Sequence, residues 1–259
     1  MEPWKTALSD HDATHIWIRG HDITSLMKSA SFTDVFFLLH HGKLPSAGER
    51  ELLDAMLIAA ADHGPGSPSA AAARFAASGN RQAPEAALSA GILAIGDVHG
   101  GAGPACMELI AAGVARSREQ AISIEQAADH AVIDSIEHKV RVPGLGHRAH
   151  AVDPRTAVLF GLAEKHGIAG NGVRFMEALA ESVKRRIKPL TINVDGAQAA
   201  LLHDMGCAPL FAKFLFIIGR SAGLTAQVTE EYTRERPMRI HVPVTYDGAP
   251  PIQEGKRDP

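Results

Sequence analysis

Helical periodicity is the feature of this sequence that most limits how the chain can fold. Alanine and leucine recur at helical spacing in long segments, several of them apolar on nearly every side, which indicates helices buried against other helices. These segments span residues 49–62, 84–95, 103–115, 124–139, 155–166, 173–184, 195–205 and 210–231. Alternating β-branched residues are confined to short pieces such as 15–19 and 239–245. The sequence therefore predicts an all-α protein.

The polarity of the chain changes past its middle. Residues 144–188 are more polar than the segments on either side. We therefore expect a small helical domain at residues 144–188, inserted into a large helical domain formed by residues 1–143 and 189–259. An active-site cleft would lie between the two domains.

Charge and cysteine content argue against several classes of protein. The formal charge of −3 gives no general attraction to nucleic acid or to an anionic membrane. The first residues lack the pattern of a secretory signal, so a cytoplasmic protein is expected. The two cysteines, Cys106 and Cys207, lie far apart, which argues against a disulfide framework or a structural zinc site and favours buried apolar roles.

Three histidines lie in the glycine-rich breaks between the expected helices. His63 and His99 each precede a glycine, and His147 follows one. A polar side chain in a rigid turn between buried helices can point into a cavity, where it can carry out acid–base chemistry. A single histidine of this kind more often caps a helix or bonds a carbonyl, but that interpretation weakens for three together. None has a histidine partner at one-turn spacing, so no metal site is expected.

Asp195 and a set of arginines complete the candidate site. Asp195 lies where a helix is expected to begin, so it is either an N-cap or a general base in a dry cleft. Arg220 lies inside an apolar helix, where a charge requires either an internal ion pair or a substrate carboxylate. Three more arginines lie near expected breaks: Arg148 in a turn, Arg155 at the start of a helix, and Arg236 directly before a proline.

Nine short motifs, in this order and spacing, resemble the citrate synthase superfamily. They are Arg19-Gly-His-Asp-Ile to Leu26, Phe32 to Pro45, Asp62-His-Gly, His99-Gly-Gly-Ala, Gly144-Leu-Gly-His-Arg, Asp153-Pro-Arg, Asn193-Val-Asp, Phe216 to Arg220 and Glu235-Arg-Pro. The resemblance covers residues 16–240 and implies a citrate synthase-like fold. It also implies a homodimer or a higher homo-oligomer.

The resemblance implies three catalytic residues, His99, His147 and Asp195. Asp195 would take a proton from the methyl group of acetyl-CoA, and His99 would hydrogen-bond the thioester oxygen as the enol forms. His147 would protonate the oxo-acid carbonyl in condensation, or take the hydroxyl proton of citryl-CoA in cleavage.

The resemblance also implies the residues that bind the substrates. The substrate-binding residues would be His63, Arg155, Phe216, Arg220 and, from a neighbouring subunit, Arg236. The coenzyme A site would be lined by Val142, Pro143, Gly144, Leu145 and Gly146, with Arg148 near a phosphate. A coenzyme A thioester would be a substrate, and no cofactor would be permanently bound.

Two features, which point in opposite directions, bear on the reaction. The interval between Pro45 and Asp62 is much shorter, which resembles citryl-CoA lyase and the lyase module of ATP-citrate lyase. His99, however, stands where that module carries an aromatic residue and true synthases carry histidine. The leading hypothesis is cleavage of citryl-CoA to acetyl-CoA and oxaloacetate.

Two alternatives remain open. The first is a compact synthase that condenses an acyl-CoA with a 2-oxo acid and hydrolyses the thioester. The second is a non-catalytic subunit that binds coenzyme A or partners a citryl-CoA synthetase. Retention of His99, His147 and Asp195 argues against the second, because a binding module needs no acid–base set.

Overall fold

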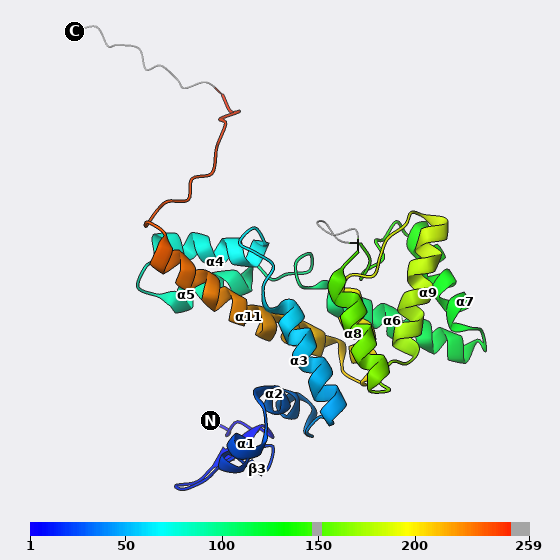
Figure 1. Cartoon of the computed structure of the whole chain (residues 1–259), viewed down its shortest axis with the longest axis horizontal. Helices are drawn as coiled ribbons and strands as arrows, with labels where there is room; N and C mark the ends of the chain where they lie inside the picture. Colours follow the sequence, from blue (N-terminus) through cyan, green and yellow to red (C-terminus); the bar gives the residue numbers. More distant parts are fainter. Residues whose placement is uncertain (147–151, 250–259) are drawn as a thin grey trace.

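The computed structural model describes residues 1–146 and 152–249, and its helices dominate this part of the chain (Figure 1). The helices are α1 (Ile23–Ser29), α2 (Phe32–His41), α3 (Ala47–Ala61), α4 (Pro68–Gly79), α5 (Pro84–Leu93), α6 (Ala102–Glu119), α7 (Ile124–Glu137), α8 (Pro154–Lys165), α9 (Asn171–Arg186), α10 (Val194–Asp204) and α11 (Pro209–Arg234). The strands are β1 (Ser9–His11), β2 (Ile16–Ile18) and β3 (His21–Asp22). The all-α prediction is confirmed.

The short strands form one antiparallel sheet, in the order β1-β2-β3, at the N-terminal end. The expected strand at residues 15–19 contains β2, whereas the alternating piece at 239–245 forms no strand in the described chain. Three helices, α1, α2 and α4, have no counterpart among the segments predicted from periodicity. Local signals do mark α2, which begins with a capping box of Ser31 and Asp34.

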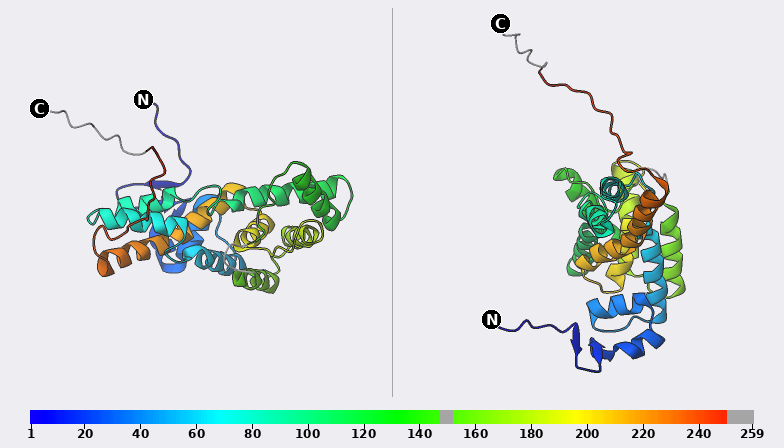
Figure 2. Two further views of the ribbon diagram at one scale, coloured as in Figure 1. Left: turned by 90° about the horizontal axis from the view of Figure 1, so that it is seen from above. Right: turned by 90° about the vertical axis from the view of Figure 1, so that its left-hand side faces the viewer.

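The 26-residue helix α11 runs from the end of the molecule that holds α4 and α5 to its middle. It packs on α3, α4, α5, α6 and α10, and Figure 1 shows α4 and α5 at one end, with α6 to α9 at the other. Figure 2 shows the same arrangement from above. By length and composition α11 is apolar enough to cross a membrane, a property that core helices of soluble proteins share. In this fold, α11 is the helix against which several other helices pack.

The two helices of the expected small domain, α8 and α9, share a core with the helices around them. α8 packs on α3 and α10, and α9 packs on α6, α7 and α10. Leu159 of α8 and Phe175 of α9 belong to the same buried apolar cluster as Met107 of α6 and Leu201 of α10. This shared core fixes the start of α8 against the start of α10. The division into domains stays a prediction.

Candidate active site

Asp195 lies in the first turn of α10, but it does not cap the helix. Asn193 is the N-cap, and its side chain accepts a hydrogen bond from the Gly196 amide at 3.0 Å. The capping interpretation of Asp195 is therefore wrong, and its carboxylate is available for another role. Burial raises the pKa of Asp195, a change that the nearby charges of Arg155 and Arg220 oppose. A carboxyl group whose ionised form is disfavoured is a stronger base when it does ionise.

The turn expected to line the coenzyme A site lies directly on the start of α10. The Gly146 amide donates to the Thr191 carbonyl at 2.8 Å, and the Asn193 amide donates to the Gly144 carbonyl at 3.1 Å. A Cβ atom at Gly196 would lie 2.3 Å from the Gly144 carbonyl oxygen, so only glycine permits this approach. The backbone contact places the predicted turn, Val142, Pro143, Gly144, Leu145 and Gly146, beside Asp195. His147 and Arg148, which follow it, lie outside the described residues.

Arg155 is paired within the protein. Its Nε and Nη2 atoms donate to the two carboxylate oxygens of Asp153 at 2.9 and 2.8 Å, and Nη1 donates to the Ala59 carbonyl at 2.9 Å. Burial raises the pKa of Asp153, but the hydrogen bonds from Arg155 outweigh it and lower the pKa to about 2. Asp153 also accepts from the Val194 amide at 3.0 Å, which ties α8 to α10 next to Asp195.

Arg220 is buried without a carboxylate partner. Its Nε donates to the Ala60 carbonyl at 2.8 Å, and Nη1 donates to Ser67 and Ser69, each at 3.3 Å. Within the described residues no carboxylate forms an ion pair with it, and no acceptor bonds its Nη2 atom. The internal ion pair considered for Arg220 is therefore not found. Burial lowers the pKa of Arg220, because it disfavours the charged form of the side chain. A positive charge here without a carboxylate partner favours binding of an anionic ligand.

His99 is linked to Arg220 through Ser69. The Ser69 amide donates to His99 Nε2 at 3.2 Å, and the Ser69 hydroxyl lies 2.9 Å from the same atom. Because a backbone N–H can only donate, Nε2 acts as an acceptor, and the proton of the neutral ring is assigned to Nδ1. Nδ1 can then donate a hydrogen bond. Phe216 packs edge-on to His99, with ring centroids 6.1 Å apart, and lies under the Arg220 guanidinium.

Two further predicted residues, His63 and Arg236, are exposed. His63 is exposed in the turn that follows α3. Arg236 is exposed beyond the end of α11. The last residue of that helix, Arg234, lies roughly 20 Å along the helix axis from Arg220, because an α-helix rises about 1.5 Å per residue. Arg236 therefore lies away from Asp195 of its own chain. Its role in a neighbouring subunit stays a prediction.

Sequence reasoning missed three residues of this site: Ser69, Asp153 and Lys213. Ser69 and Asp153 are almost completely buried and hold His99 and Arg155, as described above. Lys213 donates to the Gly96 carbonyl at 2.9 Å, in the turn that carries His99, and its charge lowers the pKa of Asp195. A lysine within an apolar helix and an aspartate before Pro154 were the available signals.

The structure thus gathers most of the predicted site at one junction. The charges of Arg155 and Arg220 both act on Asp195, and Arg220 contacts Ser69, the partner of His99. The junction is formed by the end of α3, the starts of α8 and α10, and the middle of α11. In the ranges 1–146 and 152–249, no group of three or more His, Cys, Asp or Glu side chains is arranged to hold a metal ion.

The fold is that of a helical protein, and this junction places the carboxylate of Asp195 in the field of the buried Arg220. Residues 46–241 match the family described as "Citrate synthase, C-terminal domain". The chain belongs to the citrate synthase family. The resemblance noted in the sequence is therefore confirmed.

Two relatives of known name are synthases. The 2-methylcitrate synthase of Shewanella oneidensis is 30% identical over 207 residues, which cover 79% of this chain and 52% of that protein. The citrate synthase of Haloferax volcanii is 28% identical over 225 residues, covering 85% and 57%. This chain thus spans about half the length of these relatives.

Two similar solved structures are lyases. Citryl-CoA lyase from Hydrogenobacter thermophilus is 37% identical, with a TM-score of 0.88 and 97% of both chains covered. ATP citrate lyase from Methanosaeta concilii, a D541A mutant in complex with (3S)-citryl-CoA, is 21% identical, with a TM-score of 0.77 and coverage of 95% of this chain and 43% of that chain. At that identity the second match shows the fold alone.

Proposed function

We propose that this chain is a citryl-CoA lyase that cleaves citryl-CoA to acetyl-CoA and oxaloacetate. The observation that carries the proposal is the junction itself, where Asp195, with its raised pKa, lies in the field of a buried Arg220 that has no carboxylate partner. The match with the lyase from Hydrogenobacter thermophilus over nearly all of both chains supports the direction of the reaction. So does the interval from Pro45 to Asp62, which is occupied by the single helix α3.

In this proposal each residue handles one part of the cleavage. His147 takes the proton of the citryl-CoA hydroxyl, and the bond between the hydroxyl-bearing carbon and the adjacent methylene carbon breaks. Oxaloacetate leaves with a new carbonyl group, and the bond's electron pair passes to the enolate of acetyl-CoA. His99 donates a hydrogen bond from Nδ1 to the enolate oxygen. Asp195, protonated, then gives its proton to the terminal carbon, which forms the methyl group of acetyl-CoA.

Binding of the carboxylates follows from the charges. Arg220 has an Nη2 group that can donate to a substrate carboxylate, and His63 lies at the rim of the same region. Arg155 contributes mainly by fixing Asp153 and by its positive field on Asp195. We further propose a homodimer in which Arg236 reaches the site of the partner subunit, and a coenzyme A site at residues 142–146.

A compact synthase is the second candidate, because the relatives from Shewanella oneidensis and Haloferax volcanii are named as synthases. Two assays separate the candidates. A lyase releases oxaloacetate and acetyl-CoA from citryl-CoA, which reduction of oxaloacetate by a coupled dehydrogenase reports. Steady release of free coenzyme A from acetyl-CoA and oxaloacetate would instead identify a synthase. Asp195→Asn is the control, because it should abolish either activity.

A further inference from the structure

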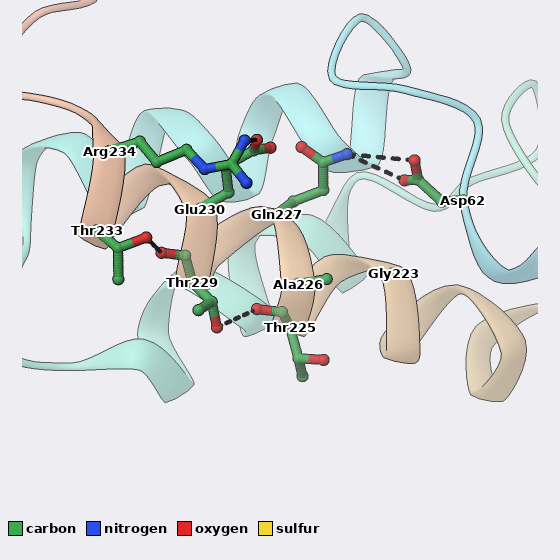
Figure 3. A pocket seen from close by; sticks show the side chains of 9 residues that line it. All are labelled: Asp62, Gly223, Thr225, Ala226, Gln227, Thr229, Glu230, Thr233 and Arg234. Carbon is green, nitrogen blue, oxygen red and sulfur yellow. Dashed lines mark hydrogen bonds and ion pairs between the residues drawn. The ribbon is translucent and has the colours of Figure 1, made fainter.

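One face of α11 holds the turn at residues 62–67 at two points. Arg220 and Gln227 are seven residues apart, so they lie on the same face of the helix, and both are buried. Arg220 donates to the Ser67 hydroxyl, and Gln227 Nε2 donates to both oxygens of Asp62 at 3.2 Å (Figure 3). A Cβ atom at Gly223, between them, would lie 1.9 Å from the Ala61 carbonyl oxygen, so the helix touches the chain just before the turn.

The first residues of the turn lie at the surface. Asp62 and His63 are exposed, and an open cavity of about 490 Å³ lies beside Asp62, lined by α11 residues that include Gly223 and Gln227. Hydrogen bonds contribute to holding the turn, including those from the Ser67 amide and hydroxyl to the Gly64 carbonyl, at 3.2 and 3.1 Å. Asp62 accepts from the Gly64 amide at 2.9 Å as well as from Gln227, so its carboxylate fixes the backbone on both sides of His63.

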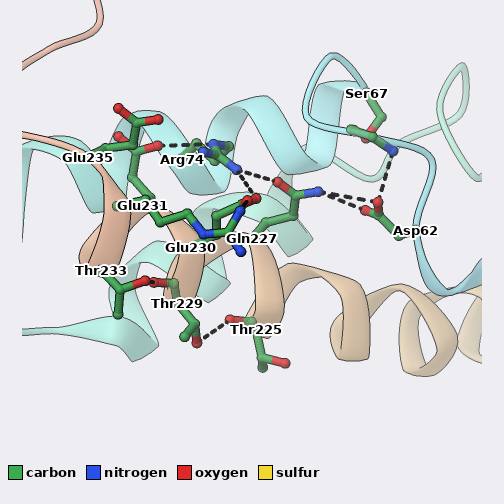
Figure 4. Close-up of polar contacts among 12 residues, drawn as sticks. Asp62, Ser67, Arg74, Thr225, Gln227, Thr229, Glu230, Glu231, Thr233 and Glu235 are labelled. Atoms are coloured by element: carbon green, nitrogen blue, oxygen red, sulfur yellow. Dashed lines mark hydrogen bonds and ion pairs between the residues drawn. The ribbon is translucent and has the colours of Figure 1, made fainter.

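The orientation of the Gln227 amide is fixed from behind. Arg74 Nη1 donates to Gln227 Oε1 at 2.7 Å, and a guanidinium group can only donate (Figure 4). The amide oxygen must therefore face Arg74, and the amide nitrogen must face Asp62. Arg74 is in turn held by Glu231, which is completely buried, through Nε at 3.0 Å.

The same buried glutamate holds the segment that follows α11. Arg239 Nε donates to Glu231 Oε1 at 2.9 Å, and the Met238 amide donates to the Ser78 carbonyl at 3.0 Å. One continuous chain of hydrogen bonds thus runs from Arg239 through Glu231, Arg74 and Gln227 to Asp62. Its parts come from α4, α11 and two connecting segments.

We propose that Gln227, fixed by the buried Arg74–Glu231 pair, is a positioning residue that holds the Asp62–His63–Gly64 turn for binding of the oxo-acid carboxylate. The inference rests on the proposed function only in naming the ligand. Gln227 does not touch the substrate; it acts through Asp62. Its loss should weaken binding of oxaloacetate and leave the coenzyme A side of the site, at residues 142–146, unchanged.

The first measurement does not depend on turnover. Hydrogen exchange of the Gly64 amide should be about tenfold faster in Gln227→Met, because the carboxylate that accepts its hydrogen bond loses its anchor. Gln227→Glu keeps an oxygen that accepts from Arg74, but an ionised glutamate has no N–H group to donate to Asp62. Because its size is close to that of glutamine, this variant should speed exchange of the Gly64 amide as Gln227→Met does, without leaving a cavity. Thr229→Ala, an exposed change on the same helix, is the control and should exchange as wild type does. Unchanged exchange at residues 61–67 in both Gln227 variants would overturn the proposal, as would equal acceleration in every helix.

The second measurement tests the ligand. The inhibition constants of the two products should respond differently to Gln227→Met. The constant for oxaloacetate should rise about tenfold, as expected for a weakened hydrogen bond to a charged group. The constant for acetyl-CoA should change less than twofold. Equal changes for both products would overturn the proposed role in carboxylate binding. If wild type turns over no substrate while the exchange result holds, the proposed function fails and the positioning of the turn stands.

Discussion

Two regions that adjoin Asp195 each hold an arginine, and they treat its charge in opposite ways. At the start of α8, Arg155 is matched by Asp153, whose two carboxylate oxygens accept hydrogen bonds from the Nε and Nη2 atoms along one edge of its guanidinium group. On α11, Arg220 is more deeply buried, and within the described residues its hydrogen bonds go to a carbonyl and two serine hydroxyls rather than to a carboxylate. The difference suggests that the first arginine builds the site and the second is kept for a ligand. A buried charge without a partner is costly, and a bound carboxylate removes that cost.

The largest expected effect is at Asp195, which feels both arginines. We expect Asp195→Asn to lower kcat by about 10²- to 10⁴-fold, the usual contribution of a general acid or base. Burial raises the folded-state pKa of Asp195, so the unfolded chain loses this proton first and stability falls as pH rises above about 4. The substitution should therefore leave stability at neutral pH equal or higher. Activity within a few-fold of wild type would remove Asp195 from the mechanism.

The region around Arg155, whose charge is paired with Asp153, is tested by measuring the stability of the protein. Asp153→Asn should lower the free energy of unfolding by about 3 kcal/mol, because it leaves the partly buried Arg155 without its counter-charge. Urea denaturation measures this change. Glu51→Gln, which disturbs a surface ion pair with Lys165, is the matched comparison and should cost much less than Asp153→Asn. Equal losses for the two variants would contradict a structural role for Asp153.

The region around Arg220, whose charge has no carboxylate partner among the described residues, is tested by measuring affinity for the substrate. Arg220→Met should raise the KM for the carboxylate substrate about 10- to 100-fold, since a hydrogen bond to a charged group contributes about 1.5–3 kcal/mol. Steady-state kinetics on citryl-CoA, or on oxaloacetate for a synthase, give this value. Arg155→Met should mainly reduce stability. The comparison breaks down if Arg155→Met raises KM as much as Arg220→Met does.

The smallest effect concerns Lys213. Its charge lowers the pKa of Asp195, so Lys213→Met should raise that pKa and move the dependent limb of the pH–rate profile to higher pH. The maximal rate should fall only a few-fold, by the loss of the bond to the Gly96 carbonyl. A profile that does not shift would mean that Lys213 only anchors the turn before His99.

Much of the fold follows from periodicity, but the site depends on contacts that the local pattern does not contain. The long apolar helices were predicted because their spacing repeats within each segment. α2 and α4 were not, although the Ser31–Asp34 capping box was present as a signal. Asp195 was identified as a candidate, yet its distinction from the N-cap required the Asn193 side chain to be seen. The partner of Arg155, Asp153, is two residues away in the sequence, but the second contact of Arg155, with Ala59, and the contacts of Arg220 with Ser67 and Ser69 join residues far apart in the sequence.

The close approach of Gly144 to Gly196 has a consequence for how such a protein can change. The turn predicted to grip the thioester carrier and the helix start that holds Asp195 touch through backbone atoms, with no side chain between them. Under the proposed function, a change in this contact would therefore alter the coenzyme A site and the position of Asp195 together.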